Sequence, residues 1–97
     1  MDKQTFFNEF GPKRDDYALP NGDVLPIREL TLAQRGKLHQ AAKDNPIEAQ
    51  ALVVCLGCDL FDESDIESVK GMPGDLVSDI ADAILALSGL MEDAEKN

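Results

Sequence analysis

Two cysteines, Cys55 and Cys58, stand three positions apart, a spacing that suits zinc binding or dithiol–disulfide exchange. A structural zinc site needs four ligands, usually from two such pairs or from one pair and two histidines, and His39 is the only histidine. A thioredoxin-like motif would follow a strand within a βαβ unit, which the sequence pattern does not provide. Because both cysteines fall on the apolar face of an expected helix, we interpret them as buried core residues.

A second candidate is the carboxylate-rich stretch from Asp59 to Glu67, which could offer oxygen ligands to a calcium ion. The stretch departs from the EF-hand pattern, because Phe61 occupies the third loop position and no glycine follows at the sixth. Acidic side chains at the start of a helix cap its free amides and interact favourably with its dipole. We therefore expect most of these acids to cap a short helix.

The chain carries no other pattern typical of catalysis. His39 has no activated serine or cysteine beside it in a triad motif. No glycine-rich phosphate loop, Walker motif or zinc-protease signature occurs in the sequence. The expectation is a non-catalytic protein that uses no cofactor and no metal.

Charge is distributed unevenly along the 97 residues, a length that suffices for one domain. Residues 1–43 carry six acidic and seven basic side chains, whereas residues 44–97 carry thirteen acidic and two basic ones. So acidic a surface repels phosphate groups, and we expect neither a nucleic-acid partner nor a membrane partner. The acids either form a solvated, solubilising surface or pair with a basic protein partner.

The sequence predicts neither a membrane span nor a secretion signal. No run of eighteen apolar residues occurs, and residues 1–7 lack the basic start and apolar stretch of a signal peptide. We therefore expect a cytoplasmic protein whose cysteines stay reduced.

The elements expected to position these residues are a β-hairpin followed by helices. Asn21-Gly22 favours a type I′ turn, and Pro20 and Pro26 confine the ribbon to a short edge. The expected fold class is mainly α (α+β), with a small N-terminal hairpin packed on a bundle of about four short helices. The expected boundaries are a flexible arm at 1–15, a single domain at 16–91 with its hairpin at 16–29 and helices at 31–42, 46–58, 64–70 and 73–91, and a frayed tail at 92–97.

Capping signals support the helix boundaries. Thr31 with Gln34 forms a capping box, and Asn45 precedes a proline at the first helical position. Ser64 with Glu67 repeats the capping-box spacing before the third helix. The helix at 46–58 is apolar almost all round, which predicts a central position in the core.

Two groups of apolar residues exceed what one small domain easily buries. The first lies in the arm and consists of Phe6, Phe7 and Phe10, and the second lies near the end of the last helix and consists of Leu85, Leu87, Leu90 and Met91. Either group can complete the core. Alternatively, either can form an interface for self-association or for a partner's helix.

The order of these motifs suggests a family. The stretch Leu19–Leu30 precedes a helix capped by Thr31 and then an apolar helix, the sequence Asp59-Leu-Phe-Asp-Glu-Ser-Asp65 follows, and the last helix ends in Leu87-Ser-Gly-Leu90. This pattern resembles the tail assembly chaperones of long-tailed bacteriophages, in which a D-L-F-x-x-x-D stretch introduces a short helix and the last helix ends near L-S-G-L or L-N-G-L. The resemblance covers about residues 17–91 and leaves out the phenylalanine-rich arm and the two cysteines.

The resemblance implies a late phage or prophage protein of the host cytoplasm. Such chaperones coat the helical tape measure protein, keep it soluble, and give way as tail tube subunits polymerise around it, and they have no catalytic residues. The expected partners are therefore the tape measure protein and the tail tube protein, together with self-association. A structural or head–tail joining phage subunit, or a small acidic adaptor protein, is the alternative.

Overall fold

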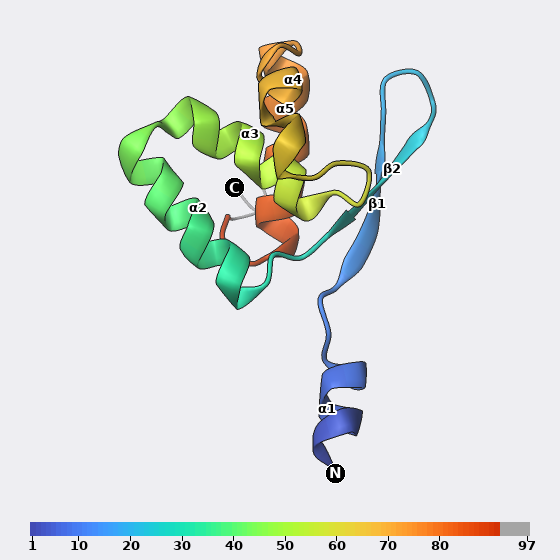
Figure 1. Ribbon diagram of the computed structural model, residues 1–97. Helices are drawn as coiled ribbons and strands as arrows, with labels where there is room; N and C mark the ends of the chain where they lie inside the picture. The colour runs from blue at the N-terminus through green and yellow to red at the C-terminus, as the bar shows by residue number, and fades with distance from the viewer. Residues whose placement is uncertain (92–97) are drawn as a thin grey trace.

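A β-hairpin and five α-helices make up the computed structural model, which describes residues 1–91 (Figure 1). This small α+β arrangement confirms the expected fold class. Within the described residues, no helix is both long and apolar enough to cross a bilayer. The tail expected at 92–97 lies outside the described residues. In chain order the elements are α1 (Lys3–Glu9), β1 (Arg14–Ala18), β2 (Val24–Arg28), α2 (Leu32–Asp44), α3 (Pro46–Gly57), the short 3-10 helix η1 (Glu63–Asp65), α4 (Ile66–Lys70) and α5 (Gly74–Leu87).

Helix α3 lies at the centre of the core, as its apolar sequence predicts. Every residue from Ala51 to Gly57 is buried, and α2, α4 and α5 each pack against this helix (Figure 1). Asn45 caps its start, because the Asn45 side chain accepts hydrogen bonds from the amides of Ile47 and Glu48 at 3.1 and 3.2 Å. The expected cap is therefore confirmed.

Helices α3 and α5 pack in close contact where Gly57 meets Ile84. A Cβ atom at Gly57 would lie 2.8 Å from Ile84 Cδ1 and closer still to Ile84 Cγ2. The Ile84 side chain is fully buried and has no solvent into which it could move. Only glycine therefore lets the two helix backbones approach this closely.

Helix α2 begins with the expected capping box. Thr31 Oγ1 accepts the Gln34 amide at 3.2 Å, and Gln34 Oε1 accepts the Thr31 amide at 2.9 Å. The helix continues to Asp44, two residues beyond the expected end. Asn45 then closes α2 and opens α3, so the two helices share one capping residue.

The hairpin forms, but its turn differs from the expected type I′ turn. That turn needs positive φ angles at Asn21 and Gly22, whereas Gly22 alone of the two has one, at 92°. Pro20 fixes a negative φ at the first central position, and the Gly22 amide donates to the Leu19 carbonyl at 3.0 Å. The Leu19 amide in turn donates to the Asp23 carbonyl at 2.8 Å. Proline thus selects a type I turn followed by a left-handed glycine.

The strands pair from Arg14 opposite Arg28 to Ala18 opposite Val24. Pairing therefore begins at Arg14 rather than at residue 16, inside the segment expected to be a flexible arm. Beyond it, the Glu29 amide donates to the Lys13 carbonyl at 2.8 Å. The side chains of Leu25 and Ile27 on β2 face the core and are buried.

The rest of the arm is also more regular than expected. Residues Lys3–Glu9 form α1, which begins with Asp2 accepting the Thr5 amide at 2.8 Å. None of its residues is buried. Figure 1 shows α1 standing apart from the other helices at the end of an extended linker.

The short helical segment after α3 uses a different cap from the expected Ser64–Glu67 pair. Asp62 Oδ1 accepts the Ser64 amide at 2.8 Å, and Asp65 Oδ2 accepts the Asp62 amide at 3.0 Å. This reciprocal pair begins η1 two residues earlier than the expected cap. An aspartate side chain performs this role as well as a serine, so the spacing of capping residues alone could not choose between them.

The last helix ends at Leu87 rather than at Met91. Gly89 has a positive φ of 74°, its amide donates to the Ala86 carbonyl, and the Leu90 amide donates to the Leu85 carbonyl at 2.9 Å. This pair of hydrogen bonds is a Schellman motif, which terminates a helix at a left-handed glycine. The apolar pattern continues past the glycine, but the helix does not.

Candidate interaction surface

An apolar groove runs between α2 and α5, with α3 as its floor. Helices α2 and α5 both pack on α3, and two adjoining depressions of about 270 and 560 Å³ lie between them. Both depressions are lined by Leu38 and Ala42 of α2 and by Leu85 of α5. We call this feature the α2–α5 groove, defined by Leu32, Leu38, Ala42, Val53, Leu85 and Leu90.

Apolar side chains at the mouth of the groove are open to solvent. Leu32, the first residue of α2, is 87% exposed, and Leu90 is 44% exposed. Helix α2 has 13 residues and is therefore about 20 Å long. A groove that follows it is long enough to receive three to four turns of a partner's helix, the mode in which amphipathic helices bind apolar grooves.

The Schellman motif brings the two leucines of the α5 wall together. In this motif the residue after the left-handed glycine commonly contacts the residue at the third position from the end of the helix, here Leu90 and Leu85. Ser88 fixes the same region, because its buried Oγ accepts the Leu30 amide at 2.9 Å and donates to the Ile84 carbonyl at 2.7 Å. Arg35 of α2 donates to the Ser88 carbonyl. Hydrogen bonds from α2 and from the end of α5 therefore fix the position of the groove mouth.

The four expected C-terminal residues do not share one surface. Leu85 and Leu90 line the groove, whereas Leu87 is half-buried and packs against the core. Met91 follows the helix and is exposed. Leu87 lies about 200° around the helix from Leu85, so it faces the opposite way.

The three expected phenylalanines form a separate cluster on α1. Phe6, Phe7 and Phe10 are between 50% and 64% exposed. The ring centroids of Phe6 and Phe7 are 5.6 Å apart, and those of Phe6 and Phe10 are 5.5 Å apart. The cluster contacts itself rather than the core.

The two walls of the α2–α5 groove differ in charge. On the α2 side the basic residue that lines the groove is Arg35. On the α5 side the acidic residue that lines it is Asp82. Opposite charges on the two sides favour one orientation of a charged helical partner.

A cluster of charged side chains attaches the hairpin to the end of α3. No local sequence pattern indicates this cluster. Arg14 and Arg28 face each other across the strands, an arrangement that is unfavourable for like charges. Asp59 accepts hydrogen bonds from both guanidinium groups, with Arg14 Nη1 at 2.5 Å from Asp59 Oδ2. Arg28 also donates to the Leu56 carbonyl at 3.0 Å, at the end of α3. The hydrogen bonds from Arg14 and then Arg28 hold the pKa of the Asp59 carboxyl below its usual value.

Replacing Asp59 with asparagine is expected to lower the stability at neutral pH and to weaken its dependence on acid. A lowered folded-state pKa contributes stability that is complete above the unfolded pKa of about 3.9 and is lost as the pH falls through the folded pKa. Urea midpoints at pH 7 and at about pH 3 should therefore differ less for Asp59→Asn than for the parent. Asp79→Asn is the control, because the Asp79 carboxylate has no ion pair within residues 1–91. If the urea midpoints at the two pH values differed equally in the parent and in Asp59→Asn, the stabilising role of the Asp59 carboxylate would be contradicted.

Both cysteines lie in the core, as expected. Cys55 is 2% exposed and Cys58 is fully buried. Burial, with a further contribution from Asp65, raises the pKa of the Cys55 thiol to about 11. Burial also raises the pKa of Cys58. Both thiols are therefore protonated at neutral pH, the form that is a poor nucleophile and a poor metal ligand.

The acids of the 59–67 stretch have structural partners. Besides Asp59, Asp62 and Asp65, the carboxylate of Glu63 pairs with Lys37 at 2.8 Å, and Glu67 pairs with Lys70 at 3.1 Å. Among residues 1–91, no three His, Cys, Asp or Glu side chains are arranged as a metal site. His39 is exposed on α2.

Comparison of this chain with protein-family models, with curated proteins and with solved structures gave no match.

Proposed function

We propose that this protein is a non-catalytic tail assembly chaperone of a long-tailed bacteriophage or prophage. It binds an apolar face of the helical tape measure protein in the host cytoplasm and keeps that protein soluble. It gives way when tail tube subunits polymerise around the tape measure protein. The observation that carries this proposal is the open apolar groove between α2 and α5, which contains Leu85 and Leu90.

The shape of the groove fits a helical client. A long helical protein that has not yet been enclosed by its tube exposes apolar stripes that would otherwise aggregate. A groove about 20 Å long, lined mainly by apolar side chains, covers one such stripe over three to four turns. Many copies bound along the client would be needed to protect its whole length.

Charge supports the same role. Residues 44–97 carry thirteen acidic and two basic side chains, so each bound copy adds negative charge to the complex. Mutual repulsion between negatively charged complexes opposes aggregation. Individual exposed charge pairs contribute little, so the apolar groove supplies most of the affinity and the charges mainly affect the association rate.

The proposal is tested by producing the tape measure protein of the same genome with and without this chain. The tape measure protein should move from the insoluble to the soluble fraction and should co-purify with this chain. Mass spectrometry of purified virions should then find no stoichiometric amount of this chain. Failure to solubilise any tape measure fragment would contradict the chaperone function. Stoichiometric presence in virions would support the alternative, a structural or head–tail joining subunit.

A further inference from the structure

A second apolar pocket lies at the opposite end of the molecule from α1. It is enclosed by the hairpin loop, the segment that leads into α4, and the start of α5, and all of its exposed lining is apolar. It shares no lining residue with the α2–α5 groove. The lining residues that are not buried are Leu19, Leu60, Phe61, Met72 and Leu76. Leu60 and Met72 are 68% and 52% exposed.

The pocket is large enough to hold one aromatic ring. It measures about 190 Å³, and an apolar cavity of about 150 Å³ is enough to bind benzene. Buried aromatic anchors in such pockets provide much of the binding energy at protein interfaces. The pocket therefore suits a single phenylalanine side chain with no polar group.

The same chain supplies suitable side chains on α1. Lys3, Phe6 and Phe7 of α1 and Phe10 at its C-terminal cap recur at helical spacing, which places them toward one face. Isolated helices shorter than about 12 residues are marginal in water. Helix α1 has seven residues, none of them buried, so it needs a surface on which to dock.

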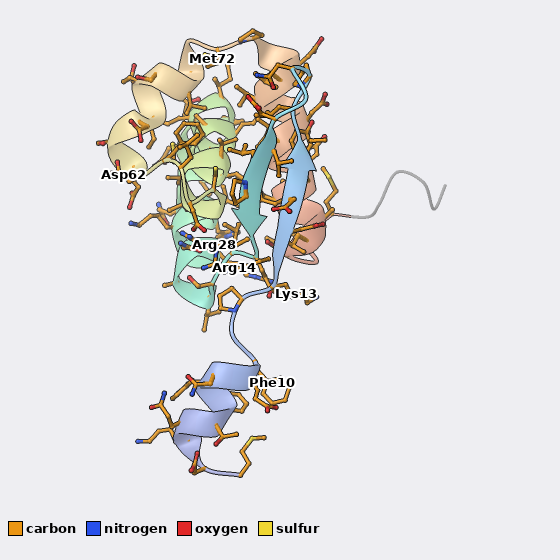
Figure 2. The ribbon with its side chains drawn as sticks, turned by 90° about the vertical axis from the view of Figure 1, so that its right-hand side faces the viewer. Phe10, Lys13, Arg14, Arg28, Asp62 and Met72 are labelled. Atoms are coloured by element: carbon orange, nitrogen blue, oxygen red, sulfur yellow. The ribbon has the colours of Figure 1, made fainter. Side chains whose placement is uncertain are left out.

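The arm is poorly placed to dock on its own pocket. Lys13 is fixed to the hairpin, because its carbonyl accepts the Glu29 amide and its amide donates to the Glu29 side chain at 3.0 Å. Figure 2 shows Phe10 at one end of the molecule and Met72 at the other. Three residues from Lys13 to Phe10 span at most about 10 Å, whereas six strand residues from Lys13 to Leu19 span about 20 Å. Phe10 therefore reaches about half of the way, and the four further residues to Phe6 add only about 6 Å in a helix.

Charge also favours docking of α1 on this pocket. Acidic residues flank the pocket, with Asp62 next to Phe61, Asp75 next to Leu76 and Asp79 next to Ile80, and all three are exposed. Figure 2 shows Asp62 toward the same end of the molecule as Met72. Lys3 lies on the phenylalanine face of α1 and has no ion pair within residues 1–91. Docking that face brings Lys3 toward the acidic rim.

We infer that the pocket bounded by Leu19, Leu60 and Met72 receives a phenylalanine side chain from the α1 helix of a second copy of this chain. Two copies can exchange arms reciprocally, which buries one phenylalanine side chain of each arm and closes the assembly with twofold symmetry. This self-association goes beyond the proposed function and does not depend on it, because the α2–α5 groove stays open.

The test is the mass of the full chain in solution, measured by sedimentation at concentrations from about 1 µM to about 1 mM. The parent should reach twice the mass of one chain as its concentration rises. Replacing Phe6, Phe7 and Phe10 together with serine should leave one-chain mass throughout, and so should Met72→Asp. Ile47→Asp is the matched control, because Ile47 is 71% exposed and lies outside the pocket, and it should dimerise like the parent.

Mixing the two defective variants separates docking from misfolding. The Met72→Asp chain keeps its arm and the serine variant keeps its pocket, so an equimolar mixture should associate although neither variant does so alone. A parent that stays at one-chain mass at every concentration would overturn the inference. So would dimerisation that persists in Met72→Asp or in the serine variant, or a mixture of folded variants that does not associate.

Discussion

Gly57→Ala is expected to destabilise the protein by about 1–2 kcal/mol. The added methyl group would overlap the buried Ile84 side chain, and overpacking of a core costs typically about 1–3 kcal/mol. The higher helix propensity of alanine, about 1 kcal/mol, offsets only part of this cost. For a chain of this size the melting temperature should fall by roughly 10 °C. Thermal and urea unfolding of the variant measure the effect.

Gly36→Ala provides the matched control. Gly36 is also a helical glycine, but an added Cβ would meet no atom within 4 Å. The same substitution should therefore stabilise the protein by up to about 1 kcal/mol through helix propensity alone. If both alanine variants shifted the stability in the same direction, contact between Gly57 and Ile84 would not be the cause.

A double-mutant cycle isolates that contact. Ile84→Ala alone should cost about 2–5 kcal/mol, because it leaves a cavity in the core. In the Gly57→Ala background the same truncation removes the overlapping atoms, so its cost should be smaller by at least about 1 kcal/mol. Additive effects would contradict the close packing of α3 against α5.

The helix caps and the central position of α3 could be predicted from the sequence, because each depends on residues that are close together in the chain. Thr31 and Gln34 form a capping box because their spacing satisfies two amides reciprocally, and Asn45 caps α3 because a short polar side chain reaches the next amides. The central position of α3 followed from apolar residues on all its faces. Such features depend on residues within one or two turns of each other.

The type of the hairpin turn and the end of α5 were predicted wrongly, because in each place two neighbouring sequence signals favour different backbone conformations. Asn21-Gly22 favours a type I′ turn, but Pro20 fixes the preceding φ and shifts the turn by one residue. The apolar stripe of α5 continues past residue 87, but Gly89 takes a left-handed conformation and ends the helix. A glycine near the end of an apolar stripe, followed by leucine, was the available signal for that end.

The interaction surface needed the tertiary structure. Leu85 and Leu90 were expected to bind a partner, whereas Leu32, Leu38 and Ala42 became part of the same surface only when α2 and α5 were placed on α3. Asp59 likewise contacts Arg14 and Arg28, which lie 45 and 31 positions earlier in the chain. No local spacing encodes contacts of this separation.

Single charged substitutions in the α2–α5 groove are expected to release the tape measure protein. Leu90→Asp and Leu32→Asp each place a carboxylate where an apolar client face would be buried, and loss of one such anchor should weaken binding by at least roughly 30-fold. Leu32→Asp should disturb folding less than Leu90→Asp, because Leu32 is 87% exposed and the helix dipole stabilises an acidic residue in the first turn. Circular dichroism should show unchanged helix content for it.

Two controls separate the groove from the rest of the surface. Ile47→Asp adds the same charge at an exposed apolar residue outside the groove, and it should bind the client like the parent. Raising the salt concentration to about 0.5 M should slow association more than it lowers the final amount bound, because charge has the supporting role. Complete loss of binding at this salt concentration would instead show that charge is the main source of affinity.

The most direct measurement is co-purification of a tape measure fragment with the parent chain, Leu32→Asp, Leu90→Asp and Ile47→Asp, each produced at the same level. We expect the parent and Ile47→Asp to retain the fragment in the soluble fraction and both groove variants to lose it while remaining folded. Equal recovery of the fragment with all four chains would contradict binding in the α2–α5 groove, and recovery with none of them would contradict the chaperone function.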